Sequence, residues 1–245
     1  MCLNKNDIND HKEETPMKKT VCAILSLMLA LLPALCAAEL SLTIPHVTEE
    51  NSTEYSDTYL GYSLRIPDFL VKVNDTYLRQ YLESMNEGKT PDSADYVYDS
   101  HLWGTQVSSE SAMIFEIQLK KCTNESFEKE VEMAPRYEEI ENAMLEETGS
   151  STRIAQLHNG ILRETPMGTM LEMAYTVNYL LDDGSSSQET HVYYDFYYNT
   201  IEYIFLLEAP TELITVESMQ QLLSELMQYV QIENVISDTA APAAA

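Results

Sequence analysis

Alternating apolar and polar residues in the second half of the chain predict an antiparallel meander of strands. The longest alternation covers 171–181, where every second residue is apolar, as expected of a half-buried strand. Asp, Gly and Ser residues at 182–185 are typical of a turn, and strands are expected at 191–198 and 201–207. Asn199 and Thr200 predict the turn between these last two strands.

Weaker patterns predict further strands and one long loop. Residues 62–66 alternate and should pair with 70–73, and residues 112–121 form another strand with one apolar face. In 153–163, Asn159 and Gly160 interrupt the pattern and predict a hairpin turn. Residues 87–110 are rich in Gly, Pro, Asp and Ser around Trp103, and we expect a loop there.

Three segments repeat apolar residues at spacings of three and four and therefore predict helices. The first lies at 78–85, with Asp75 or Thr76 as its N-cap. The second lies at 135–147, and the third at 216–231 after Thr215 as cap. With the strands, this order predicts an α+β fold in which helices pack on the faces of an antiparallel sheet.

Three segments resemble the MOG1/PsbP-like family of α/β sandwiches, which includes small exported bacterial proteins. They are YSLRIPDFLV at 62–71, the meander from TMLEMAYTVNYLLDDG to HVYYDFYYNTIEYIFLLEA at 169–209, and the closing helix. The resemblance covers 59–232 and implies the sandwich fold. It contains no shared catalytic motif, so it transfers no functional residue to this chain.

Residues 17–38, MKKTVCAILSLMLALLPALCAA, have the features of a secretory signal peptide. Two lysines precede an apolar run, Pro33 interrupts the run, and small residues predict cleavage near Ala38. The alternatives are an uncleaved membrane anchor and a lipoprotein acylated at Cys36, although Leu35 does not suit the latter. We therefore expect a secreted or extracytoplasmic protein.

The signal peptide sets the predicted organisation of the chain. The expected parts are a polar extension at 1–16 with Met17 as the true start, the signal at 17–38, a linker at 39–57, one domain at 58–232, and a disordered tail at 233–245. Only Cys122 remains after cleavage, so no internal disulfide is expected. We interpret Cys122 as a small core or edge residue rather than a nucleophile.

The acidic composition limits the possible partners. The chain has 14 Lys and Arg against 40 Asp and Glu, a formal net charge of −26. Such a surface repels phosphate backbones and anionic lipid headgroups, so nucleic-acid and peripheral-membrane binding are not expected. A membrane association would require an uncleaved signal or acylation of Cys36.

One face of the strand at 191–198 is a candidate binding surface. His191, Tyr193, Asp195 and Tyr197 share this face, and their combination of aromatic rings with polar groups can stack on sugars or peptide side chains. A second layer of helices would instead bury the face. A glycosidase pair of Asp195 with Glu172 or Glu202 is a further alternative.

The sequence contains no nucleophile elbow, paired-histidine zinc motif or EF-hand loop, so we expect no metal and no cofactor. The leading hypothesis is a non-enzymatic exported module that binds a protein, peptide or glycan. The alternatives are an extracellular hydrolase with dispersed catalytic residues and a structural component of the cell envelope.

Overall fold

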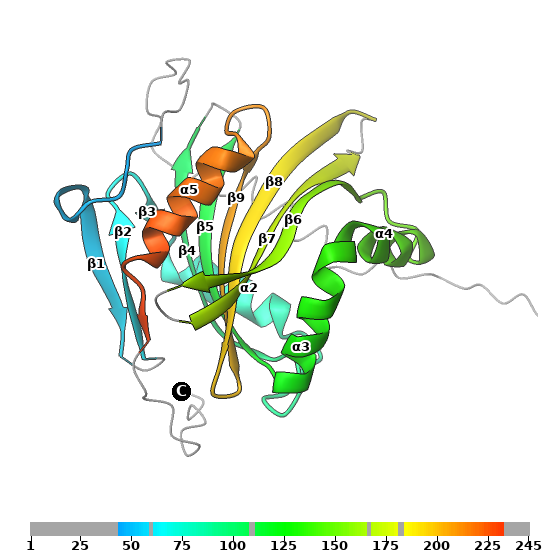
Figure 1. Cartoon of the computed structure of the whole chain (residues 1–245), viewed down its shortest axis with the longest axis horizontal. Coiled ribbons are helices and arrows are strands. Elements are labelled where there is room, and N and C mark those ends of the chain that lie inside the picture. The colour runs from blue at the N-terminus through cyan, green and yellow to red at the C-terminus, as the bar shows by residue number, and fades with distance from the viewer. Residues whose placement is uncertain (1–43, 59–60, 108–110, 166–167, 181–183, 233–245) are drawn as a thin grey trace, which may run out of the picture. The chain divides into compact units, whose positions relative to one another are not determined.

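The predicted meander forms one side of a large sheet, out to its edge, in a computed structural model of the chain (Figure 1). The structure describes residues 44–58, 61–107, 111–165, 168–180 and 184–232, all within the unit Leu35–Ala245. The predicted extension 1–16, signal 17–38 and tail 233–245 lie outside the described residues.

The large sheet has seven antiparallel strands in the order β3-β4-β5-β9-β8-β7-β6. The strands are β3 (Val71–Lys72), β4 (Val97–Gln106), β5 (Ala112–Lys121), β6 (Arg153–Thr165), β7 (Gly168–Leu180), β8 (Ser186–Tyr198) and β9 (Ile201–Pro210). Neighbours along the chain are also neighbours in the sheet from β6 to β9, which confirms the predicted meander. Asn199 and Thr200 form the β8–β9 turn with positive φ angles of 50° and 69°.

A smaller sheet of three strands has the order β1-β2-β10. Its strands are β1 (Ser52–Asp57), β2 (Tyr62–Pro67) and β10 (Gln231–Ile232), and a 3₁₀ turn, η1 (Glu49–Asn51), precedes β1. The predicted linker at 39–57 therefore contains the edge strand β1 in its described part. β3 pairs with β4, whereas the sequence predicted that it would pair with β2.

Helices cover both faces of the seven-stranded sheet (Figure 1). They are α2 (Asp75–Met85), α3 (Asn124–Met133), η2 (Ala134–Arg136), α4 (Tyr137–Glu147) and α5 (Val216–Met227). α5 and the small sheet cover one face and enclose the main core, in which Phe115, Phe205 and Leu223 are fully buried. α2, α3 and α4 lie on the other face, where the Tyr81 hydroxyl of α2 donates to Glu116 of β5.

Two helix caps show how local sequence sets these boundaries. Thr215 accepts a hydrogen bond from the Ser218 backbone N–H, as predicted for the start of α5. At α2 the cap is Asn74, whose side chain accepts from the Tyr77 N–H, rather than Asp75 or Thr76. The nearer candidate, Asp75, is one position too late in the chain, because both Asp and Asn are common N-cap residues.

The prediction of a loop at 87–110 is wrong, because this segment contains the ten-residue strand β4. Trp103 and Leu102 point to opposite sides of this strand, and both are buried. Asp99, Ser100 and His101 interrupt the apolar pattern in the middle of the strand. Since both faces of β4 are covered, the two-residue alternation that identifies a half-buried strand is absent.

The prediction of a hairpin turn at Asn159 and Gly160 is also wrong, because β6 continues through both residues as one strand of 13 residues. Its irregularity comes from two register shifts, between Ile154 and Gln156 and between Leu157 and Asn159. Bulges of this kind bend a strand without ending it.

Candidate functional site

The predicted binding face of β8 lies beneath helices. The ring of Phe127 in α3 stacks on Tyr197 with centroids 5.8 Å apart. Tyr193 packs with Tyr137 and Tyr175 in a small core under η2 and α4. His191 and Asp195 are buried. The structure thus brings the four residues to one face, but that face is covered by a second helical layer rather than open to a ligand.

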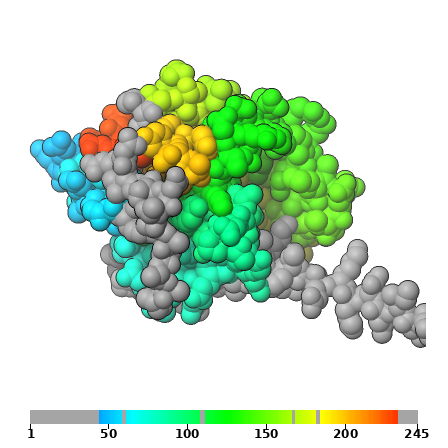
Figure 2. Space-filling view, turned by 90° about the horizontal axis from the view of Figure 1, so that it is seen from below, coloured from blue at the N-terminus to red at the C-terminus, as the bar shows by residue number. Residues whose placement is uncertain are grey.

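α3 closes the end of this face where β8 turns into β9. Its N-cap Thr123 accepts from the Ser126 N–H, and the Cys122 N–H donates to the Thr200 carbonyl in the β8–β9 turn at 3.0 Å. Figure 2 shows the orange β8–β9 turn beside the green start of α3. The segment NESFEKEVEM does not predict a helix, because the apolar residues that it packs on the sheet are only Phe127 and Val131, too few for an amphipathic pattern.

Three carboxylates meet under α3 and form the acidic cluster: Glu130 from α3, Asp195 from β8 and Glu202 from β9. Their ligand atoms lie within 4.8 Å of one another. Lys120, opposite Glu202 on β5, places its Nζ 2.7 Å from Glu202 Oε2. Asp195 and Glu202 are both 0% exposed, so the solvent cannot screen their charges.

Burial and the neighbouring Glu202 raise the pKa of Asp195 well above its ordinary value. The same two causes raise the pKa of Glu130 to about 7. Burial opposes ionisation of Glu202, but hydrogen bonding to Asp195 and the charge of Lys120 lower its pKa overall. These opposite shifts favour a protonated Asp195 beside an ionised Glu202, which is the carboxylate paired with Lys120.

The pKa values of His191 and Cys122 are also shifted by their buried surroundings. His191 Nδ1 lies 3.1 Å from Glu208 Oε1, and its ring stacks on Tyr175 with centroids 5.2 Å apart. Burial opposes protonation of His191, but the Glu208 charge raises its pKa overall. Burial and Glu202 raise the pKa of the Cys122 thiol to about 12, which makes it a poor nucleophile.

The carboxylate pairs do not have the geometry of a glycosidase. Asp195 and Glu202 have carboxylate oxygens within 4.8 Å of each other and no exposed surface, whereas glycosidase carboxylates flank a cleft about 5–9.5 Å apart. Glu172 lies on the opposite face of the sheet from Asp195, where Tyr194 and Gln220 donate to it. Neither predicted pair can therefore work as acid and base on one substrate.

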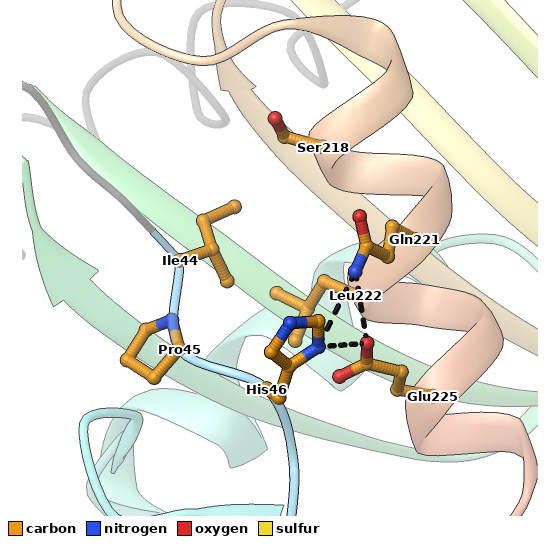
Figure 3. Close-up of a pocket in the computed structure, with 7 residues that line it drawn as sticks. All are labelled: Ile44, Pro45, His46, Ser218, Gln221, Leu222 and Glu225. Atoms are coloured by element: carbon orange, nitrogen blue, oxygen red, sulfur yellow. Dashed lines mark hydrogen bonds and ion pairs between the residues drawn. The ribbon is translucent and has the colours of Figure 1, made fainter.

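A shallow pocket of about 330 Å³ lies where residues 44–46 cross α5 (Figure 3). His46 Nδ1 is 2.6 Å from Glu225 Oε1, and the Gln221 amide donates to the same carboxylate at 3.1 Å. Ser218 also lines the pocket, but its hydroxyl bonds to Thr215 at 3.1 Å, and it lies further along α5 from the imidazole. Ser218, His46 and Glu225 therefore do not form a catalytic triad.

No family model matches the chain, and no curated protein matches it. Several solved structures are similar. The cyanobacterial PsbP (CyanoP) of Synechocystis has 11% identity, covers 78% of this chain and 98% of its own, and gives a TM-score of 0.44. The Ran-binding protein Mog1p of Saccharomyces cerevisiae has 9% identity, covers 74% of this chain and 95% of its own, and gives a TM-score of 0.39.

A protein from Bacteroides thetaiotaomicron has 11% identity, covers 76% of this chain and 50% of its own, and gives a TM-score of 0.38. The resemblance to MOG1/PsbP-like proteins predicted from the sequence is therefore found again at the level of fold. These likenesses concern the fold and indicate no function. Among the described residues, no helix is both long and apolar enough to cross a membrane.

Replacing Asp195 with asparagine is expected to weaken the pH dependence of stability. Because the folded state raises the pKa of Asp195 above its ordinary 3.8, folding takes up a proton, and stability falls as pH rises above that value. An amide can donate to Glu202 as the protonated acid does, without a charge to bury. Urea unfolding at a series of pH values from 4 to 8 measures the effect.

The exposed Asp92→Asn variant is the control for this experiment, since it removes the same charge from the surface. We expect Asp195→Asn to flatten the decline in unfolding free energy, while Asp92→Asn retains the wild-type slope. Equal slopes in all three proteins would show that Asp195 is not the proton-binding group.

Proposed function

We propose that this chain is an exported, non-enzymatic binding or accessory module that holds an extended segment of a protein partner outside the membrane. The signal-like residues 17–38 support export. The closure of the acidic cluster supports a non-enzymatic role, because its most perturbed carboxylate, Asp195, is inaccessible to a substrate. The edge strand β6 carries the proposal for the mode of binding.

β6 is the last strand of the seven-stranded sheet and is 13 residues long. Its far edge offers backbone groups to which another strand can pair. Ile161 and Leu162 lie on this strand with 47% and 51% of their surface exposed. Strand addition uses such an edge for affinity and adjacent side chains for specificity.

The first half of the β6 edge is already covered. Asn142 of α4 both donates to the Ile154 carbonyl at 2.9 Å and accepts from the Ile154 N–H at 2.8 Å. Glu138 accepts from the Leu157 N–H at 3.0 Å. α4 thus occupies the edge at 154–157, and the proposed docking site is the remaining segment at 159–164.

Charge favours a basic partner over a second copy of the chain. The net charge of −26 repels an identical molecule and attracts a segment rich in Lys and Arg. We therefore propose an extended, basic peptide segment with two adjacent apolar residues, one on each face, as the ligand. An apolar residue beside Ile161 and another beside Leu162 would contact both faces of the edge strand.

Selection from a displayed peptide library on the immobilised full chain tests this proposal. We expect enrichment of basic sequences with two adjacent apolar residues, and at least tenfold weaker binding by the Ile161→Lys/Leu162→Lys variant, because lysines on an edge oppose strand addition. Leu180→Lys is the matched control, since Leu180 is equally exposed, at 55%, but lies on β7.

Two outcomes would contradict the proposal. One is the absence of enriched peptides, or peptides that bind the double lysine variant as well as the wild type. The other is a dimer in solution that the double lysine variant abolishes, which would make a second copy the occupant. Hydrolysis of peptides, glycans or esters that is lost on changing His191 or Asp195 would favour the hydrolase instead.

A further inference from the structure

Three metal-ligating side chains from different sheets converge beside the main core. Asp57 ends β1 in the small sheet, while Asp99 and His101 lie two residues apart on β4 in the large sheet. Their ligand atoms are all within 4.8 Å of one another. His101 Nε2 is 3.0 Å from Asp99 Oδ2 and 3.4 Å from Asp57 Oδ2. We name these three residues the Asp–Asp–His site.

Aromatic packing holds the imidazole in place. The Tyr55 ring meets the His101 ring edge to face with centroids 5.3 Å apart, and it meets Trp103 in the same way at 5.1 Å. Trp103 in turn packs on Phe115 in the core. A ligand fixed in this way keeps its geometry when a metal ion binds, so little ordering is required.

Oxygen atoms of three side chains surround His101 Nε2. Besides the two carboxylates, the Tyr55 oxygen lies 3.0 Å from Nε2. A divalent cation can bind both carboxylates and the nitrogen together.

We infer that Asp57, Asp99 and His101 form a binding site for a divalent transition-metal ion, for which Zn²⁺ is the best fit. One imidazole nitrogen and two carboxylate oxygens are ordinary zinc ligands. Zinc–ligand bonds of about 2.0–2.2 Å at tetrahedral angles separate neighbouring ligand atoms by about 3.4 Å. The distances from Nε2 to Asp99 and Asp57, 3.0 and 3.4 Å, are close to that separation.

The same donors argue against calcium, which takes six to eight oxygen ligands. They also distinguish this site from the acidic cluster, in which Lys120 already compensates the charge of Glu202. The side chain of His101 is 13% exposed, so an ion can reach it. A bound Zn²⁺ would join β1 to β4 and so fasten the small sheet to the large one, independently of peptide binding at β6.

Metal titration of the chelator-treated full chain tests this inference. We expect one equivalent of Zn²⁺ to bind tightly in calorimetry, and Co²⁺ at the same site to give the visible absorption of tetrahedral coordination. Asp99→Asn and His101→Gln should each weaken Zn²⁺ binding at least tenfold. Glu130→Gln, which alters the acidic cluster instead, should bind Zn²⁺ as the wild type does.

Circular dichroism in the presence of chelator checks that each variant folds. A measurement on the unaltered protein covers the case in which a variant does not fold: on adding Zn²⁺, the imidazole ¹⁵N signals of His101 should shift, and those of His158 should not. Failure of the wild type to bind one tight equivalent would overturn the inference. Wild-type affinity in folded Asp99→Asn, or an unchanged His101 signal, would overturn it as well.

Discussion

Replacing Glu172 with alanine is expected to destabilise the protein by about 3–5 kcal/mol, because several donors lose their acceptor at about 1–3 kcal/mol for each buried group. Glu172 is 1% exposed and forms an ion pair with Arg163. Tyr194, Asn159 and Gln220 also donate hydrogen bonds to it, at 2.8, 2.6 and 3.0 Å. Its loss leaves buried donors without an acceptor, which is costly for each of them.

This carboxylate connects four elements, because its partners come from β6, β8 and α5 while it lies on β7 itself. Urea unfolding followed by the fluorescence of the only tryptophan, the buried Trp103, measures the loss. At roughly 2–4 °C per kcal/mol for a domain of this size, the expected decrease in Tm is on the order of 10 °C.

Two comparison variants isolate the effect of burial. Glu172→Gln keeps an acceptor oxygen and should lose less stability than Glu172→Ala. Glu139→Ala removes a surface ion pair with Arg136, and its Tm should remain near that of the wild type, because such pairs are solvated and contribute little. If Glu172→Ala and Glu139→Ala unfold at the same temperature, the buried network does not stabilise the fold.

Local sequence predicts this fold where one face of an element is exposed and the other is buried. β5 is predicted at its observed bounds, 112–121, and the meander strands β7 to β9 are predicted in order. β4 is missed because it is covered on both sides and has polar residues in its middle. α3 is missed because its sequence is nearly all polar, and only its contact with β8 shows that the helix belongs there.

The sequence predicts even less of the candidate site, because its contacts are made between distant elements. Strand alternation shows that His191, Tyr193, Asp195 and Tyr197 share a face, but it does not show whether another layer covers that face. The partners that perturb Asp195 are Glu202, on the next strand, and Glu130, on a helix that the sequence did not predict. The Asp–Asp–His site likewise depends on the contact of two sheets, which no spacing along the chain reveals.

Gly160 of β6 presents a position where the packing of a helix requires the absence of a side chain. A Cβ added there would lie 2.5 Å from the Ala134 carbonyl oxygen in η2 and 2.9 Å from the Met173 sulfur. The carbonyl is part of the backbone that connects α3 to α4, so it cannot move aside without moving both helices. The residue that suggested a turn is therefore a close-contact glycine in a continuous strand.

Gly160→Ala is expected to destabilise the fold by about 1–3 kcal/mol through overpacking, and to loosen the helical layer over β8. Gly104→Ala is the matched control: it also lies in a strand, but its new Cβ would closely approach the flexible Ile114 side chain, at 3.1 Å, and lie at an ordinary contact distance of 3.6 Å from the Met113 carbonyl oxygen. Urea unfolding gives the free energies, and hydrogen exchange at 124–147 reports on α3 and α4. Equal losses in the two variants, or unchanged exchange in Gly160→Ala, would contradict the close contact between Gly160 and η2. A larger loss for Gly160→Ala with faster exchange would show that this contact keeps the helices over His191 and Asp195, and so keeps the acidic cluster closed.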